Sequence, residues 1–324
     1  MGNTLLKIPP FHDAHIHFME GGRGLPCDAG PSLAKEYLSC GVVSVVDMGH
    51  QNGLGSTFRH NLTKGGEGPA LIIQTAVQAL HKKGTYGGFL GKGVSGDREI
   101  KKTIREIARS GADFLKIVNS GIVSLKEEAP VTPGGFTSEE WRCIAEEAGL
   151  HNLKICCHAN GDLAIRQALS FGVSSIEHGF FISEESLEQM AQEGISWTPT
   201  LFALQSLEPF LQKKERTLLE KIVDNHLKAV YDGLAKGIRL KIGTDSGSKG
   251  VQPGRSFFKE LQLFKRAGLS LDQIVMSACL GPDDVKKGNY LLVSDDFIDR
   301  GKIEALYLDE RKIVMTRLLK GNSE

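Results

Sequence analysis

Eight short apolar runs, each with the length and composition of a buried β-strand, recur along the chain and alternate with helical patterns. Most of these runs are rich in Val and Ile and continuously apolar, which is typical of strands buried on both faces of a parallel sheet. They lie at residues 11–17, 42–47, 70–77, 113–118, 154–158, 174–178, 195–199 and 239–244. Eight such strands with intervening helices predict an α/β fold of the (β/α)8 type, a TIM barrel.

The helical segments begin and end at recognisable residues. Thr137 and Ser183 are hydroxyl residues followed by acids, so each is the predicted start of a helix, and the second helix ends at Gly194. Asp97 is the predicted cap of a third helix. The glycine-rich stretch 21–24 lacks the G-x-G-x-x-G spacing that a nucleotide-binding open sheet more often carries, which favours the barrel.

The alternation of strands and helices stops near residue 270. Residues 271–279 read as a helix, and 303–309 with 312–315 read as a small β-hairpin. We therefore expect two parts, a barrel over 1–285 and a C-terminal β-hairpin appendage over 286–324 that packs on the barrel.

The charge of the chain is balanced, with 39 Lys and Arg against 39 Asp and Glu. This balance gives no basic surface for nucleic acid or for acidic membranes, and no apolar run reaches the ~18 residues of a membrane span. The six cysteines show no C-x-x-C spacing, and the first ten residues are too short in apolar length for a signal peptide. We expect a cytoplasmic protein with a small-molecule substrate, for which a homo-oligomer stays open.

Potential metal ligands stand at or near the ends of the predicted strands. His15 and His17 are two residues apart in the first strand, so both side chains point to the same face and can bind one ion. Four further candidates lie in or after later strands: Lys116, His158, His178 and Asp245. The C-terminal strand ends of a parallel barrel form its active face, so these six residues predict one metal site.

Lys116 is the most unusual member of this set. It lies inside the apolar run 113–118, and burying an ammonium costs free energy unless the group is neutralised or paired. An ion pair with Asp245 is one interpretation. Carbamylation by carbon dioxide is the other, because it creates an anionic oxygen ligand that can bridge two ions. Imidazole and carboxylate ligands together suit Zn²⁺, with Mn²⁺ and Fe²⁺ as alternatives.

These residues resemble the amidohydrolase superfamily, and in particular its imidazolonepropionase-like and prolidase-like branch. The resemblance extends from Pro10 to about Gly288. The motifs that carry it lie at residues 10–17, 114–121, 136–140, 157–161, 175–179 and 242–247.

The resemblance implies a binuclear metal hydrolase. The two histidines of the first strand would hold the more buried ion, His158 and His178 the more exposed one, and a carboxylated Lys116 would bridge them. Asp245 would bind the buried ion and take a proton from a bridging water, which makes Asp245 and Lys116 the implied catalytic residues. The expected reaction is hydrolysis of an amide, peptide-like or cyclic amide bond by a metal-bridged hydroxide, without a serine or cysteine nucleophile.

Two departures from the family pattern bear on the substrate. Only about ten residues precede the first strand, so we expect a β-sandwich that lacks most of its N-terminal part. The stretch 81–88 matches the glycine-rich loop of the branch only loosely. Candidate substrate contacts are Tyr86, His81 and Asn160, with the first two expected in a loop above the barrel. A dipeptide, an N-acyl amino acid, a cyclic amide and a lactone all remain open as substrates.

Two rival functions are weighed against this one. A mononuclear deaminase or cyclic-imine hydrolase of the same superfamily typically has a glutamate three residues after the strand-five histidine. This chain has Gly161 there, and Lys116 has no use in such a site. A catalytically inactive barrel that serves as a binding module is the rival from another class, and the presence of all six ligands argues against it.

Overall fold

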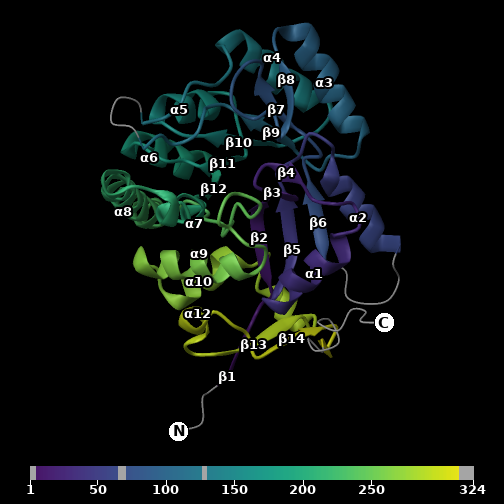
Figure 1. The fold of residues 1–324 in the computed structure, drawn as a ribbon, viewed down its shortest axis with the longest axis vertical. Coiled ribbons are helices and arrows are strands. Elements are labelled where there is room, and N and C mark those ends of the chain that lie inside the picture. The colour runs from purple at the N-terminus through teal and green to yellow at the C-terminus, as the bar shows by residue number, and fades with distance from the viewer. Residues whose placement is uncertain (1–4, 65–70, 126–129, 314–324) are drawn as a thin grey trace.

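The computed structural model describes residues 5–64, 71–125 and 130–313. Its centre is a set of parallel strands surrounded by helices (Figure 1). Strands β2, β5 and β6 form one hydrogen-bonded ladder, and β12, β11, β10, β9, β7 and β8 form a second, with every pairing parallel. The barrel strands are β2 (Phe11–Ile16), β5 (Val42–Asp47), β6 (Ile72–Thr75), β9 (Leu115–Val118), β10 (Ile155–Ala159), β11 (Ser175–His178) and β12 (Ser196–Thr198).

Residues 239–246 fill the eighth position of the barrel without forming a regular strand. On one side the N–H of Lys241 donates to the carbonyl of Trp197 at 2.8 Å, and on the other the N–H of Ala14 donates to the carbonyl of Ile242 at 2.8 Å. The predicted strand at 239–244 is therefore wrong as a regular strand, although its position between β12 and β2 is right. Gly243 lies close to β2, since an added Cβ would be 3.0 Å from the backbone nitrogen of His15. The segment is therefore crowded against β2 at the point where its pairing is irregular.

The predicted third strand, 70–77, is shorter than expected, and a further strand follows it. The chain turns at Val77, whose φ is +62°, and then forms β7 (Ala79–Lys82), which pairs with β9 and with β8 (Gly91–Val94). His81 lies in β7, so its expected place in a loop is wrong. β8 approaches β7 closely at Gly91, where a Cβ would be 1.9 Å from the carbonyl oxygen of Ala79.

Two of the predicted helix starts are confirmed, and one is wrong. Thr137 caps α4 in a reciprocal capping box, and Ser183 caps α6, which ends at left-handed Gly194. Gly96, not Asp97, occupies the N-cap of α3. The helices are α1 (Gly30–Ser39), α2 (Leu54–Lys64), α3 (Asp97–Arg109), α4 (Ser138–Leu150), α5 (Asp162–Ser170), α6 (Glu184–Glu193), α7 (Leu201–Gln205), η1 (Glu208–Phe210), α8 (Lys213–Ala235), α9 (Arg255–Arg266), α10 (Leu271–Ala278), α11 (Asp283–Lys286) and α12 (Phe297–Arg300).

A small antiparallel sheet lies at one end of the barrel, at the bottom of Figure 1. It contains the expected hairpin, β14 (Ala305–Leu308) with β15 (Arg311–Ile313), and also β13 (Tyr290–Ser294) paired with β1 (Leu5–Ile8). The N-terminal segment therefore contributes a strand to the appendage. Phe297 of α12 stacks on Phe11 of β2 at 6.1 Å, which anchors the appendage to the barrel. The division at residue 285 stays a prediction. A further two-stranded ribbon, β3 (Met19–Glu20) with β4 (Arg23–Gly24), follows β2.

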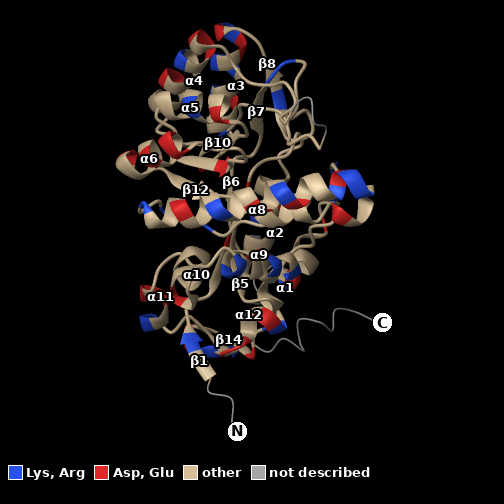
Figure 2. Ribbon diagram, turned by 90° about the vertical axis from the view of Figure 1, so that its left-hand side faces the viewer, with Lys and Arg blue, Asp and Glu red and all other residues tan. Residues whose placement is uncertain are grey.

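Charged residues of both signs are interspersed along the outer helices (Figure 2). This distribution agrees with the balanced composition of the chain. In the described part of the chain, every helix is too short or too polar to cross a bilayer.

Candidate metal centre

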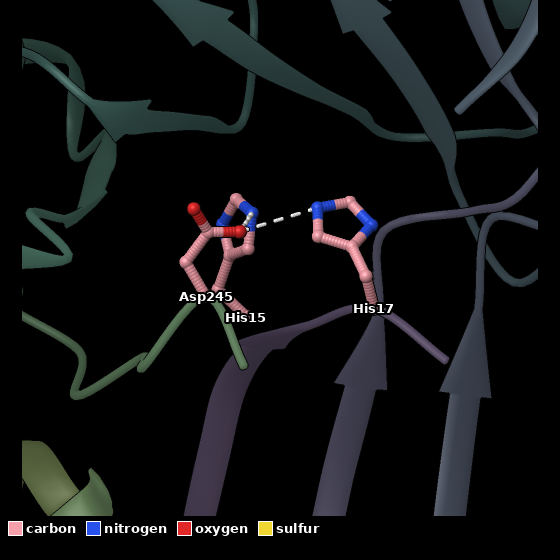
Figure 3. Close-up of side chains that lie close together, drawn as sticks. All are labelled: His15, His17 and Asp245. Atoms are coloured by element: carbon pink, nitrogen blue, oxygen red, sulfur yellow. Dashed lines mark ion pairs between the residues drawn. The ribbon is translucent and has the colours of Figure 1, made fainter. Parts of the chain in front are cut away.

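His15, His17 and Asp245 converge at the ends of β2 and of the 239–246 segment (Figure 3). Asp245 Oδ1 lies 3.5 Å from His15 Nε2 and 3.3 Å from His17 Nε2. One ligand atom from each residue falls within 4.8 Å of the other two, so a single cation can contact all three. The chain positions Asp245 through backbone pairing, because its N–H donates to the carbonyl of His15 at 2.7 Å.

The histidines of β10 and β11 extend this group into a continuous row of imidazoles. The ring centroids of His15 and His178 are 4.9 Å apart, and those of His178 and His158 are 4.5 Å apart. All are buried. The structure therefore brings together the four histidines that the sequence predicts at strand ends.

Outer partners orient each ring of this row. A ligating imidazole usually donates its second N–H to a carboxylate or carbonyl, which fixes the nitrogen left for the metal. In three of the rings Nδ1 makes this outer contact, so Nε2 is the nitrogen left for a metal. The contacts are His15 with Glu177 at 2.7 Å, His17 with the carbonyl of Gly49 at 3.1 Å, and His178 with Thr200 Oγ1 at 2.6 Å. His158 uses Nε2 toward the carbonyl of Gly121 at 3.0 Å, which leaves Nδ1.

Glu177 is the functional candidate that reasoning from the sequence missed. Its Oε2 accepts from His15 Nδ1, and its Oε1 accepts from the hydroxyl of Ser175 at 2.6 Å. Burial raises the pKa of this carboxyl, but the side-chain hydrogen bonds from His15 and Ser175 outweigh this effect and lower it to about 2. The available signal was an acidic residue inside an apolar strand next to a ligand histidine.

The protonation states of the centre suit cation binding. Burial lowers the pKa of His15, and it lowers the pKa of His158 to about 3, with the charge of Lys116 adding to both effects. These rings are therefore neutral at pH 7, which is the form that binds metals. Burial raises the pKa of Asp245, but its side-chain contacts with His17 and Ser248 outweigh this effect and lower the pKa to about 2. Asp245 is thus a carboxylate.

Lys116 ends inside this centre without a partner. Its side chain is 1% exposed, and its Nζ has no hydrogen-bond partner among the described residues. Burial lowers the pKa of the amine, so the neutral form of Lys116 is more favoured than that of a lysine exposed to water. The expected alternative, an ion pair with Asp245, is absent from the described part of the chain. The nearby His15 Nε2 also lacks a hydrogen-bond partner. Two orphaned nitrogens among neutral imidazoles and a carboxylate fit a divalent cation site.

Three residues at the centre have left-handed backbone conformations. His178 has a φ of +66°, Asp245 of +57° and Thr200 of +47°. Such conformations cost roughly 1–3 kcal/mol each for residues other than glycine, and they cluster at functional sites. Glu260 of α9 holds the Thr200 turn, because the two oxygens of its carboxyl group accept the N–H groups of Leu201 at 2.8 Å and Phe202 at 2.7 Å.

A cavity of about 540 Å³ opens above the centre, with His158, His178 and Asp245 in its lining. Most of the remaining wall is apolar, and includes Met19, Phe89, Ile122, Val123, Phe180, Ala203, Leu204 and Leu207. A mostly apolar concavity with a few convergent polar groups is typical of a small-molecule site.

The sequence profile of the amidohydrolase family matches residues 6–285. The chain belongs to the amidohydrolase family. Ochratoxinase of Aspergillus niger is 28% identical to this amidohydrolase over 315 residues, which cover 84% of this chain and 63% of ochratoxinase. The chain thus spans less than two thirds of that relative's length.

Solved structures show the same fold. A Xaa-Pro dipeptidase with bound methionine superposes with a TM-score of 0.78 at 20% identity, covering 95% of this amidohydrolase and 87% of the dipeptidase. The crystal structure of A. niger ochratoxinase gives a TM-score of 0.75 at 21% identity, covering 94% of this chain and 82% of ochratoxinase. These likenesses confirm the predicted α/β barrel fold.

Of the three predicted substrate contacts of this amidohydrolase, two line the cavity and one does not. Tyr86 lines the cavity, with its ring 5.6 Å from that of His158. Asn160 also lines it, while its Oδ1 accepts from the N–H of Phe180 at 3.2 Å. His81 does not line the cavity, and its Nδ1 lies 3.0 Å from the carbonyl of Lys82. The structure therefore keeps two of the three candidates at the site.

Proposed function

We propose that this amidohydrolase is a metal-dependent enzyme that hydrolyses amide bonds of small molecules with two bound divalent ions. The observation that carries the proposal is Lys116, a buried amine without a partner in the midst of neutral imidazoles and one carboxylate. An unpaired buried amine costs stability, and it persists in a fold where it has a use.

The residues divide between the two ions by their positions. His15, His17 and Asp245 would hold one ion, since their ligand atoms already lie within 4.8 Å of one another. His158 and His178 would hold the second. Imidazoles with a carboxylate favour Zn²⁺, with Mn²⁺ and Fe²⁺ as alternatives.

Lys116 would connect the two halves as a carbamate. The neutral Nζ attacks carbon dioxide, so an N–C bond forms while one C=O π bond opens and its electron pair moves to oxygen, and the nitrogen loses one proton to water. The product is an anion with two oxygen donors, which removes the unpaired amine from the barrel interior. A neutral amine is required for this attack, and burial favours that form of Lys116.

Bound divalent ions supply a water of lowered pKa and polarise the substrate carbonyl. Asp245 accepts the proton of the attacking water and later donates it to the leaving nitrogen. The hydroxyl of Ser248 donates to Asp245 Oδ2 at 2.9 Å, so Oδ1 remains directed at the two histidines.

The amide substrates that remain open are dipeptides, N-acyl amino acids and cyclic amides, with lactones as the ester alternative. The likeness to a Xaa-Pro dipeptidase favours dipeptides among these classes. We also propose a cytoplasmic location. Its support is the absence of disulfides among the cysteines, all of which are free.

Metal content tests the proposal directly. Protein grown with added zinc or manganese and purified with bicarbonate is analysed by plasma mass spectrometry, and hydrolysis of dipeptides and N-acyl amino acids is assayed on the same samples. Two ions per chain with turnover are expected. One ion would favour the mononuclear rival, and none would favour the inactive binding module.

A matched pair of histidine variants locates the second ion. His178→Gln removes one ligand of that ion and is expected to reduce the content to about one ion per chain. His151→Gln, at the end of α4 beside Glu147, should keep both ions. Equal metal content in the two variants would contradict the assignment of His178.

A further inference from the structure

One cationic residue outside the metal centre lines the cavity above it. Apart from the histidines and Asp245, the described lining of this cavity is apolar or neutral except for Lys249. Lys249 is exposed, so its ammonium lies at the open side of this cavity, where a cation within reach of a bound ligand favours ligands of negative charge.

Lys249 is available to a ligand. Its Nζ lies 3.7 Å from the centroid of the Phe210 ring, in a cation–π contact. No ion pair or side-chain hydrogen bond to a carboxylate is found for it among the described residues. A charge-assisted hydrogen bond to a carboxylate is stronger than an exposed cation–π contact, so a carboxylate can draw the ammonium away from the ring.

The backbone at Lys249 is fixed relative to the metal centre. Ser206, after α7, donates its hydroxyl to the carbonyl of Lys249 at 2.8 Å. The loop leaves Asp245 through Gly247, which has a φ of +100° and lies where a Cβ would be 2.5 Å from the carbonyl oxygen of His17. Lys249 therefore follows the proposed general base by four residues, in a loop that is held at both ends.

A neighbouring cavity of about 530 Å³ shares Lys249 with the first cavity. The described lining of this second cavity includes the carboxylates Glu20 and Glu36, which repel an anion. A ligand carboxylate is therefore favoured on the metal side of Lys249 and disfavoured on the other side.

We propose that Lys249 binds the carboxylate of the substrate, which makes the substrates N-acyl amino acids or short peptides with apolar groups. Neutral cyclic amides and lactones lack the group that this subsite holds. This inference rests on the proposed function only where it calls the bound molecule a substrate. The binding of a carboxylate by Lys249 does not depend on hydrolysis.

Binding of an inert probe tests the subsite without turnover. The probes are N-benzenesulfonyl-L-leucine, whose sulfonamide replaces the scissile amide, and its neutral carboxamide, titrated calorimetrically into zinc-loaded protein. A charged hydrogen bond corresponds to roughly a 10- to 100-fold preference of the unaltered protein for the carboxylate probe. Lys249→Met should abolish this preference, Lys249→Arg should keep most of it, and Lys214→Met on exposed α8 should keep all of it.

The comparison of the two probes separates recognition from structural support. If Lys249 served only to tie its loop to Phe210, Lys249→Met would weaken both probes alike. A carboxylate probe that binds the unaltered protein no better than the carboxamide, or a preference that survives in Lys249→Met, overturns the proposal.

Turnover of N-benzoyl-L-leucine and its carboxamide distinguishes failure of this inference from failure of the proposed function. The expected result is a rise in KM for the acid of roughly 10-fold or more in Lys249→Met, with kcat changed far less. A carboxylate preference in binding with no hydrolysis of any amide would keep the subsite and refute the hydrolase. Hydrolysis without a carboxylate preference would keep the hydrolase and refute the subsite.

Discussion

Replacing Glu177 with Gln tests whether this buried carboxylate serves the metal centre. Glu177 accepts the Nδ1–H of His15 at 2.7 Å, and both side chains are at most 1% exposed. Glutamine preserves the size of the side chain and keeps an oxygen that can accept from His15. The substitution therefore removes the charge of residue 177 and leaves the packing of the strand in place.

The magnitude follows from the kind of hydrogen bond that is lost. A hydrogen bond to a charged group contributes about 1.5–3 kcal/mol, against about 0.5–1.5 kcal/mol for a neutral pair. The difference of about 1–1.5 kcal/mol corresponds to roughly a tenfold weaker affinity of the His15 site for its ion. No reduction for solvent screening applies, because water does not reach this pair.

Competition with a chelator of known zinc affinity measures the change. Glu147→Gln is the matched control, since Glu147 is also a buried carboxylate, 2% exposed, and bonds Arg105 at 2.8 Å on the outer helices. Both variants are expected to lower the unfolding temperature, but only Glu177→Gln should weaken metal binding. Zinc affinity in Glu177→Gln within a factor of two of the unaltered protein would refute the reasoning.

Two further variants extend the test to the carboxyl groups at positions 245 and 260. Asp245→Asn is expected to lower kcat by roughly 100- to 10,000-fold while some metal stays bound, and near-normal turnover would contradict its role as general base. Burial raises the pKa of Glu260 to about 8, so the folded protein holds a proton that the unfolded chain releases above about 4.5. Its contribution to the free energy of unfolding therefore falls as pH rises from about 4.5 to about 8, and Glu260→Gln should flatten that slope in urea titrations. Equal slopes in the two proteins would mean that Glu260 is ionised throughout.

The positions of the strands were predictable because each barrel strand is a short apolar run that is separated from the next by a helical pattern. The irregular segment 239–246 was not, since its apolar pattern is that of a strand. Its departure comes from packing, with Gly243 against His15 and a left-handed backbone at Asp245. The same limit explains β7 and β8, whose pairing depends on a backbone approach that only Gly91 permits.

The convergence of the candidate ligands at strand ends was predictable because their residue types are rare in apolar runs. Their supporting residues were not, since Thr200 and Gly49 have no unusual chemistry until the fold brings them to His178 and His17. Tyr86 and His81 illustrate the same point. Both belong to one polar, glycine-containing stretch, and only the turn between β7 and β8 sends the first into the cavity and the second away from it.

The centre depends on the outer helix layer as well as on the strands. Thr200 reaches His178 from a left-handed backbone conformation, and the turn that holds this conformation is fixed by Glu260 of α9. A carboxyl group on a covering helix thus supports the orientation of an imidazole inside the barrel. Because Leu204 and Leu207 of the cavity wall follow the same turn, the shape of the cavity and the position of His178 depend on the same contact. The Glu260 contact therefore supports both the apolar wall, which would select a substrate, and His178, which would hold the more exposed ion.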